Sequence, residues 1–220
     1  MNLSLRLNMQ PYERIKRLVD IVGAAVGLVF FSPALLLTAL YVKLVSPGPV
    51  FADMPKRVGR GGRLFRMFKF RSMIPNAHEY LLKHPKLYEQ YRRNNYKLPP
   101  KEDPRLIRGG RFLRKSSIDE WPQLINVLKG EMSLVGPRAY YPFELEEQRN
   151  RYPDRTSLID KVLSIKPGLT GLWQVSGRSE ISFPKRVELD ATYAERRSFL
   201  YDLWLILRTP WVVISGRGAE

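Results

Sequence analysis

Hydrophobic residues gather first in one long run near the start of the chain, from Ile21 to Val42, where none of the 22 residues is charged. A helix of that length would be about 33 Å long, enough to cross the hydrocarbon core of a bilayer. Ser32-Pro33 stands in the middle of the run, where proline removes a backbone donor and kinks or breaks a helix. Each half would then be about 16 Å long and would reach only the middle of the bilayer.

Positive charge flanks both ends of this run. The basic residues are Arg14, Lys16 and Arg17 before it and Lys43, Lys56 and Arg57 after it. Because positive charge marks the cytoplasmic side, both ends are expected there. We therefore predict a basic amphipathic lead-in over residues 1–17 and a re-entrant helix-break-helix over 18–46, with Ser32 satisfying part of the backbone freed at Pro33. A kinked true span, a buried helix of a soluble protein and a signal peptide stay open as alternatives.

The remaining residues, 47–220, carry shorter patterns. Residues 64–73 alternate apolar and basic side chains, which predicts a half-buried strand with one cationic face. The preceding Gly61-Gly62 is either a hairpin turn or, with the adjacent arginines, an anion-binding nest. Residues 75–102 place leucines and tyrosines at roughly helical spacing and end near two prolines, which predicts an amphipathic helical insertion.

The C-terminal half predicts further helices around one short strand. We expect a polar helix over 144–161, a turn-and-strand unit over 167–178, and a helix over 186–201. Residues 199–215 place Tyr201 and two tryptophans among aliphatic residues, broken at Thr209-Pro210, which predicts an interfacial segment.

Two adjacent carboxylates, Asp119 and Glu120, stand where another helix is expected to begin. Ser117 followed three residues later by Glu120 has the spacing of a capping box, so we predict a helix from 118 to 129 that ends at Gly130. A helix N-terminus favours an ionised carboxylate and attracts phosphate. The simpler interpretation, that these residues only cap the helix, stays open on this segment alone.

Composition narrows the chemistry. The net charge is +16, from 37 Lys plus Arg against 21 Asp plus Glu, which suits nucleic acid, an anionic membrane surface or phosphorylated substrates. There is no cysteine, so disulfides and thiolate metal sites are excluded. With His78 and His84 as the only histidines, a metal held by carboxylates and phosphate is expected to be Mg²⁺, or else Mn²⁺.

Many segments, in this order, resemble the bacterial sugar transferase family, monotopic enzymes that move a sugar phosphate from a nucleotide sugar to polyprenyl phosphate. The resemblance covers nearly the whole chain. The segments that carry it are Lys16-Arg17, Ser32-Pro33, Lys69-Phe70-Arg71-Ser72-Met73, Ser117-Ile118-Asp119-Glu120, Pro122-Gln123, Asn126-Val127-Leu128-Lys129-Gly130, Met132-Ser133-Leu134-Val135-Gly136-Pro137-Arg138 and Lys166-Pro167-Gly168-Leu169-Thr170-Gly171. One departure is Ala139, where the family usually has proline, which affects the rigidity of that turn.

The resemblance implies roles for individual residues. Asp119 looks like the nucleophile that forms an aspartyl-phosphosugar intermediate, and Glu120 looks like the Mg²⁺ ligand or its support. The residues implied in phosphate binding are Lys69, Arg71, Arg111, Arg114, Pro137 and Arg138. Arginine suits bidentate phosphate contacts, and a carboxylate attacking a diphosphate needs cations to neutralise the developing charge.

The resemblance also implies an architecture and partners. We expect an α+β fold in which a re-entrant membrane hairpin precedes a mostly helical catalytic domain, with a small β element and interfacial amphipathic helices, on the cytoplasmic face of the bacterial inner membrane. The expected partners are a UDP-hexose donor, undecaprenyl phosphate, the bilayer and downstream glycosyltransferases that complete exopolysaccharide, capsule or O-antigen.

Several questions stay open at this stage. The chain looks more like members that transfer galactose or glucose phosphate, but no residue discriminates the sugar. Homodimerisation is possible, and the sequence does not indicate whether it occurs. A catalytically inactive scaffold and a basic nucleic-acid binder are the competing hypotheses. We expect no nucleic-acid partner, because such a role leaves the pair Asp119 and Glu120 unexplained.

Overall fold

The fold was analysed on a computed structural model, which describes residues 11–94, 98–99, 101–177 and 181–215. Its helices are α2 (Pro11–Val45), α3 (Ala77–Leu82), α4 (Pro85–Arg93), α5 (Gly110–Lys115), α6 (Gln123–Lys129), α7 (Pro142–Arg151), α8 (Thr156–Leu163), α9 (Leu172–Ser176), α10 (Phe183–Arg196) and α11 (Phe199–Ser215), with 3₁₀ turns η1 (Arg60–Gly62), η2 (Ile118–Glu120) and η3 (Pro153–Arg155). The strands are β1 (Arg57–Val58), β2 (Leu64–Phe65), β3 (Ser133–Val135) and β4 (Gly168–Thr170). A mostly helical chain with a small β element is therefore confirmed.

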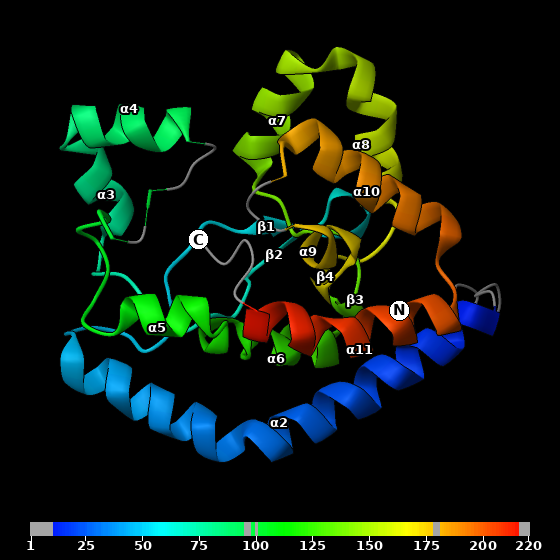
Figure 1. Ribbon diagram of the computed structural model, residues 1–220, viewed down its shortest axis with the longest axis horizontal. Helices are drawn as coiled ribbons and strands as arrows, with labels where there is room; N and C mark the ends of the chain where they lie inside the picture. Colours follow the sequence, from blue (N-terminus) through cyan, green and yellow to red (C-terminus); the bar gives the residue numbers. More distant parts are fainter. Residues whose placement is uncertain (1–10, 95–97, 100, 178–180, 216–220) are drawn as a thin grey trace.

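Helix α2 is continuous rather than broken, which corrects the expected helix-break-helix: Pro33 lies inside it. Pro33 has no N–H to donate to the carbonyl of Val29, and the Ser32 hydroxyl donates to that same carbonyl at 2.7 Å instead. The prediction that Ser32 satisfies this backbone is confirmed. Figure 1 shows the helix bent near its middle, with both ends rising toward the rest of the protein.

One side of α2 packs on the rest of the chain. Gly23 and Gly27 lie one turn apart, and a β-carbon on them would stand 2.7 Å from the Leu134 side chain and 3.1 Å from the Leu124 side chain, respectively. These glycines therefore let β3 and α6 approach the helix closely. Arg17 donates to the carbonyls of Val127 and Leu128 at 2.6 and 2.7 Å, a cation at the C-terminal end of α6.

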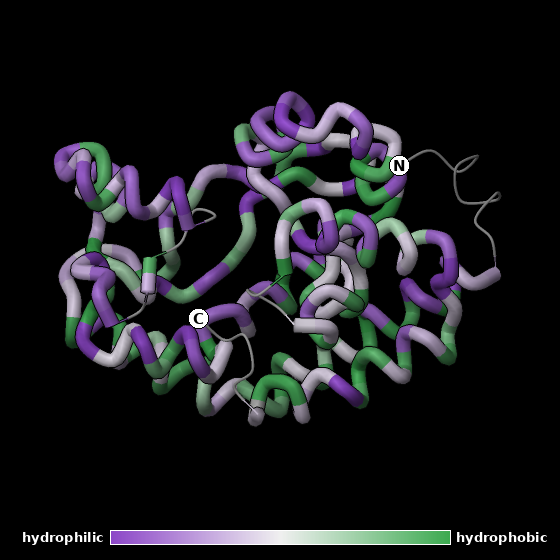
Figure 2. The backbone as a smooth tube through the Cα atoms, turned by 45° about the horizontal axis from the view of Figure 1, so that its top comes forward, coloured by the Kyte–Doolittle hydropathy of each residue, from purple (hydrophilic) through white to green (hydrophobic). Residues whose placement is uncertain are grey.

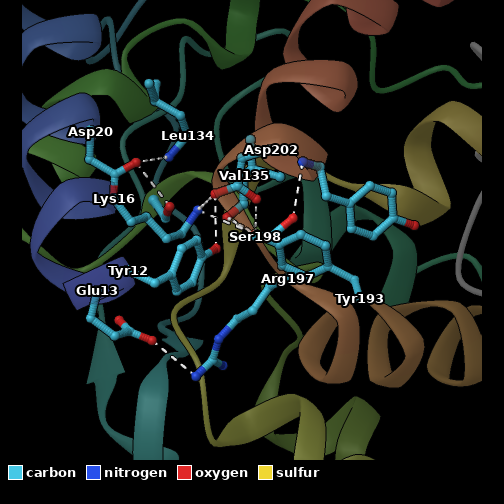
Figure 3. Close-up of polar contacts among 12 residues, drawn as sticks. Tyr12, Glu13, Lys16, Asp20, Leu134, Val135, Tyr193, Arg197, Ser198 and Asp202 are labelled. Carbon is cyan, nitrogen blue, oxygen red and sulfur yellow. Dashed lines mark hydrogen bonds and ion pairs between the residues drawn. The ribbon is translucent and has the colours of Figure 1, made fainter. Parts of the chain in front are cut away.

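Polar contacts fix the start of α2 against α10 and α11 (Figure 3). Lys16 contacts Asp202 at 2.7 Å, Tyr12 donates to the same carboxylate at 2.9 Å, and Tyr193 donates to its other oxygen at 2.6 Å. We call these four residues the α2–α11 network. A separate ion pair, Arg197 with Glu13 at 3.0 Å, lies beside it.

The opposite side of α2 is apolar and exposed. Val29, Phe30 and Leu36 are 75%, 74% and 71% exposed, and on α11 Leu200 and Trp211 are 74% and 75% exposed. In Figure 2, green hydrophobic stretches run along the lower edge of the molecule, interspersed with white and purple ones. Among the described residues, α2 is the one helix long and apolar enough to cross a membrane, and only 11% of its most apolar window is buried. A core helix of a soluble protein would be mostly buried, so this surface indicates membrane association.

The short elements follow their patterns with identifiable corrections. The hairpin alternative for Gly61-Gly62 is confirmed, since β1 and β2 pair antiparallel around them. The strand predicted over 64–73 is formally paired only at Leu64–Phe65, although single bridges at Phe70 and Met73 keep it extended. Strand β4 pairs in parallel with β3, so the strand of the predicted unit over 167–178 is confirmed. The rest of that prediction is wrong, because Leu172–Ser176 form helix α9.

At three prolines, the observed helix bounds differ from the predicted ones. The helical insertion consists of two helices, because Pro85 starts α4. The helix expected over 144–161 divides into α7 and α8 at Pro153, whose ring cannot continue the first helix. Helix α11 runs across Pro210, so the expected break there is wrong.

Candidate active site

The pair Asp119 and Glu120 lies in a 3₁₀ turn rather than in the first turn of an α-helix. The turn η2 covers Ile118–Glu120, and the α-helix begins only at Gln123. The predicted start of the helix at residue 118 is therefore wrong. Its predicted end at Gly130 is confirmed by a left-handed φ of 79°. The capping box is also wrong: Ser117 makes no side-chain cap and itself adopts a left-handed φ of 57°. Such strain in a non-glycine residue is typical of functional sites.

Lys69 holds both carboxylates. Its Nζ atom lies 2.9 Å from Oε1 of Glu120 and 3.0 Å from Oδ2 of Asp119. The second contact is an ion pair without hydrogen-bond geometry, so Oδ2 of Asp119 is buried and finds no hydrogen-bond partner among the residues that the structure describes. Asp119 is 1% exposed, whereas the Glu120 side chain is 42% exposed. One carboxylate is therefore enclosed and the other faces outward.

The backbone around Lys69 is placed by residues far away in sequence. The N–H of Phe70 donates to the carbonyl of Asp119 at 2.8 Å, which aligns the extended segment with the turn. Asn126, fully buried in α6, accepts from the N–H of Phe68 and donates to the carbonyl of Arg66, each at 2.8 Å. Asn126 thus positions the strand that carries Lys69, a role that only its contacts reveal.

The electrostatics separate the two carboxylates. Burial raises the pKa of Asp119, with the charge of Lys69 opposing the rise and the charge of Glu120 adding to it. The Lys69 ammonium lowers the pKa of Glu120 to about 2. Burial alone would lower the pKa of Lys69, but the two carboxylates raise it. Lys69 and Glu120 are therefore charged near neutral pH, whereas the pKa of Asp119 is shifted upward, in the opposite direction from that of Glu120.

Three arginines and Lys69 form a cationic cluster around Asp119 and Glu120. Arg114 lowers the pKa of Asp119, in the same direction as Lys69. Arg138 and Arg57 both lower the pKa of Glu120, behind the larger effect of Lys69. Arg57 was absent from the predicted site; it is buried, donates to the carbonyl of Ala139 at 3.0 Å and lies 3.3 Å over the Tyr141 ring. Its place beside the site comes from the fold, since the sequence marked it only as one of the basic residues after the apolar run.

Two of the predicted phosphate-binding arginines lie elsewhere. Arg71 is 4% exposed and donates to the carbonyls of Pro49 and Ser46 and to the Ser46 hydroxyl at 2.6 to 2.9 Å, so it fastens the turn after α2. Arg111 is exposed in α5 and donates to the carbonyl of Lys101 at 2.7 Å. Pro137 is buried and its carbonyl accepts from Gly168 at 2.8 Å. The structure therefore gathers Lys69, Arg114 and Arg138 from the predicted set and directs Arg71 and Arg111 into other contacts.

The donor set suits a hard divalent cation. Mg²⁺ takes oxygen ligands and usually keeps waters and substrate phosphates among them. Asp119 offers a buried oxygen that is ion-paired with Lys69 but accepts no hydrogen bond from the described residues, and Glu120 offers an exposed carboxylate next to it. The described residues gather no cluster of three or more potential metal ligands, so substrate and water would have to supply the other positions. The residues present fit an Mg²⁺ ion brought together with a phosphate.

The bend of α2 directly contacts the turn that carries Asp119 and Glu120. The ring of Phe31 lies 4.0 Å, centroid to centroid, from the ring of Trp121, which follows Glu120 in the chain. Phe31 precedes Ser32-Pro33, so the bent part of the apolar helix contacts the residues beside both carboxylates. A group held at Asp119 would therefore lie close to the apolar surface.

Comparison with known proteins gives a family match along almost all of the chain. The family described as bacterial sugar transferase matches residues 11–216. An undecaprenyl-phosphate galactose phosphotransferase from Salmonella typhimurium is 42% identical over 208 residues, which are 93% of this chain and 41% of that protein. The exopolysaccharide production protein ExoY from Rhizobium meliloti is 39% identical over 208 residues, 93% of this chain and 87% of that protein.

A third relative is also about as similar to this chain along nearly all of this chain's length. The galactosyl transferase CpsE from Streptococcus agalactiae is 41% identical over 206 residues, which are 93% of this chain and 43% of that protein. The chain thus spans about two fifths of some relatives and nearly the full length of others.

Proposed function

Because the chain belongs to the bacterial sugar transferase family, we propose that it transfers a hexose-1-phosphate from a UDP-sugar to undecaprenyl phosphate and thereby begins the assembly of a polysaccharide. The observation that carries the proposal is the enclosed Asp119 carboxylate, held by Lys69 and surrounded by arginines, directly beside an apolar helix. Such a site suits a phosphate reaction whose acceptor lies in lipid. The galactose relatives favour a galactose phosphate as the hexose.

The proposed reaction has two displacements. A carboxylate oxygen of Asp119 attacks the phosphorus that bears the sugar, an aspartyl–phosphorus bond forms, and the bond to UMP breaks. A phosphate oxygen of undecaprenyl phosphate then attacks the same phosphorus and releases the Asp119 carboxylate. Lys69, Arg114 and Arg138 offset the negative charge that gathers on the phosphates, which is the largest obstacle for an anionic nucleophile.

We assign Mg²⁺ to Asp119 and Glu120 as part of the same proposal. When bound, the ion would neutralise phosphate charge at the site. The role of the chain is to keep Glu120 ionised, which the low pKa of about 2 supports, and to hold Asp119 dry beside it. Glu120→Gln should therefore raise the Mg²⁺ concentration needed for half-maximal activity.

We propose a monotopic placement on the cytoplasmic face of the inner membrane, with α2 entering and leaving through one leaflet. At 35 residues α2 would be about 52 Å long, well beyond a hydrocarbon core of about 30 Å. Its bend, its exposed apolar outer side and the basic residues at both ends support a re-entrant path.

Release of UMP tests the function. Purified protein in nanodiscs is mixed with undecaprenyl phosphate and Mg²⁺, and UMP is measured over a panel of UDP-sugars. We expect turnover with UDP-galactose and, in the absence of acceptor, a covalent phosphosugar adduct on the chain. Asp119→Asn should abolish the adduct, whereas Asp53→Asn, a matched change at a side chain that is 91% exposed, should not.

The outcomes separate the competing hypotheses. An adduct that survives Asp119→Asn would reject this residue as the nucleophile. Absence of turnover with every sugar in a folded, membrane-bound protein would support the inactive scaffold instead. Salt-dependent DNA binding without turnover would support the nucleic-acid binder.

Topology is tested with single cysteines, which the chain permits because it has none of its own. Arg14→Cys and Lys43→Cys lie near opposite ends of α2. In inverted inner-membrane vesicles, whose cytoplasmic face is outward, a membrane-impermeant maleimide should label both. Labelling of only one of them would establish a true span.

A further inference from the structure

A charged side chain lies in the apolar helix α2 and takes no part in the proposed chemistry. Asp20 is 3% exposed, and its Oδ1 atom accepts from the Ser133 hydroxyl at 2.9 Å and from the N–H of Leu134 at 2.8 Å (Figure 3). Asp20 and Ser133 are 113 residues apart in the sequence. Burying a carboxylate in a membrane-associated helix costs free energy, so such a residue points to a function.

The strand that Asp20 holds leads straight to a residue of the site. Ser133 and Leu134 belong to β3, and Arg138 follows three residues after that strand ends. Leu134 also packs against α2 at Gly23, where any side chain would collide with it. The strand is thus fixed to the membrane helix by two hydrogen bonds and by close packing.

The backbone between β3 and Arg138 has no room to absorb a shift. Gly136 donates to the carbonyl of Thr170 at 2.8 Å, and Gly168 donates to the carbonyl of Pro137 at 2.8 Å. A β-carbon on Gly136 would lie 2.5 Å from the carbonyl oxygen of Lys166. A displacement of β3 is therefore expected to move residues 136–138 as well, because this backbone cannot adjust locally.

A second buried carboxylate holds the far side of the turn. Asp190 of α10 is 0% exposed, and its Oδ2 atom accepts from the N–H of Arg138 at 3.2 Å and from the Tyr140 hydroxyl at 3.1 Å. The segment from Ser133 to Tyr140 is therefore held at one end by Asp20 from the membrane helix and at the other by Asp190.

We propose that Asp20 is a positioning residue for the reaction: through β3 it sets the place of Arg138, so that the membrane helix is part of the support of the active site. The proposal rests on the proposed function of Arg138 at the donor phosphates. It predicts that disturbing Asp20 weakens the donor step even when membrane binding is intact.

A double-mutant cycle tests this, with the rate of adduct formation in a single turnover without acceptor as the readout. Asp20→Asn keeps the shape of the side chain and removes its charge. In the native background it should slow adduct formation by about tenfold, the size expected for hydrogen bonds to a charged group. In an Arg138→Lys background, Asp20→Asn should slow adduct formation by less than about twofold. The arginine whose position Asp20 is proposed to set is then already replaced by a lysine, which cannot make bidentate contacts with phosphate.

Two variants keep the test interpretable. Ser133→Ala removes one of the bonds from the strand side and should show a smaller loss with the same dependence on Arg138. Glu13→Gln breaks another contact between α2 and the rest of the chain, the ion pair with Arg197, and should leave the rate unchanged. Thermal unfolding and recovery in the membrane fraction are measured for each variant.

Equal losses from Asp20→Asn in both backgrounds would overturn the proposal, because Asp20 would then act independently of Arg138. If Asp20→Asn does not fold, Ser133→Ala decides, and a loss that is absent or independent of Arg138 overturns the proposal as well. If Arg138→Lys alone has no effect on adduct formation, the proposed function of Arg138 is wrong, which is a different result from additivity.

Discussion

Two buried lysine–carboxylate sites in this protein differ in one respect. In the α2–α11 network, Lys16 lies 2.7 Å from Asp202, and both carboxylate oxygens accept hydrogen bonds. At the candidate active site, Lys69 lies 3.0 Å from Asp119, but within the described part of the chain Oδ2 of Asp119 accepts no hydrogen bond. A satisfied buried network stabilises a fold, whereas an unsatisfied one costs free energy and needs another reason to exist. The comparison assigns support to the first and chemistry to the second.

The largest expected effect comes from Asp119→Asn. The loss of the proposed nucleophile should lower turnover by about 10³-fold or more. The midpoint of thermal unfolding should stay the same or rise, because the change removes a buried charge that is incompletely bonded. UMP release and a melting curve on the same preparation measure both. A marked fall in the melting temperature would mean that Asp119 supports the fold as Asp202 does.

The reverse outcome is expected for Asp202→Asn. This change weakens hydrogen bonds from Tyr12, Lys16 and Tyr193, so the free energy of unfolding should fall by about 1.5–3 kcal/mol. Turnover measured well below the melting temperature should stay within a few-fold of the native rate, since Asp202 lies outside the cationic cluster at Asp119. Tyr201→Phe, a nearby change in the same helix, serves as the control and should affect neither quantity.

A third prediction concerns Arg57, which the fold adds to the site. Arg57→Lys keeps the charge but loses the planar group that lies over Tyr141 while it bonds to Ala139. We expect about a tenfold loss in kcat/KM for the UDP-sugar, the size of one hydrogen bond from a charged donor. Arg71→Lys, which changes an arginine that contacts Ser46 and Pro49, should alter stability more than kcat/KM.

The smallest effect is a change in pH dependence. Because the folded-state pKa of Asp119 lies above its ordinary value of 3.8, activity should begin to fall on the acid side at a higher pH than for an ordinary aspartate. Stability should change in the opposite direction at this residue, since a raised carboxyl pKa favours the folded state as Asp119 takes up its proton. Glu120→Gln removes a charge that raises this pKa, so the acid limb of the remaining activity should move to lower pH. An unmoved limb would mean that another group controls it.

Local signals in the sequence were reliable where neighbours along the chain make the structure. The apolar run predicted the long helix, Ser32 satisfies the carbonyl that Pro33 leaves free, and Gly130 ends α6. The Gly61-Gly62 hairpin also follows from the freedom of glycine to adopt a positive φ.

Local signals failed where a distant partner competed for the same group. The spacing of Ser117 and Glu120 predicted a capping box, but the Glu120 carboxylate binds Lys69, 51 residues away, and the helix begins later. The family resemblance implied a phosphate role for Arg71, but its guanidinium bonds to the turn after α2. A charged group bonds to whatever partner the fold brings nearest, and spacing does not reveal which one that is.

Residue type and order are enough to identify the family, the apolar helix with its proline, and the pair Asp119 and Glu120 among cations. The fold adds that Asp119 is enclosed while Glu120 faces outward, that Arg57 lies beside the site, and that Asp20 reaches Ser133 across 113 residues. These features could not be predicted from the sequence, because burial and ion pairing depend on which segments pack together, and this packing is a property of the whole chain.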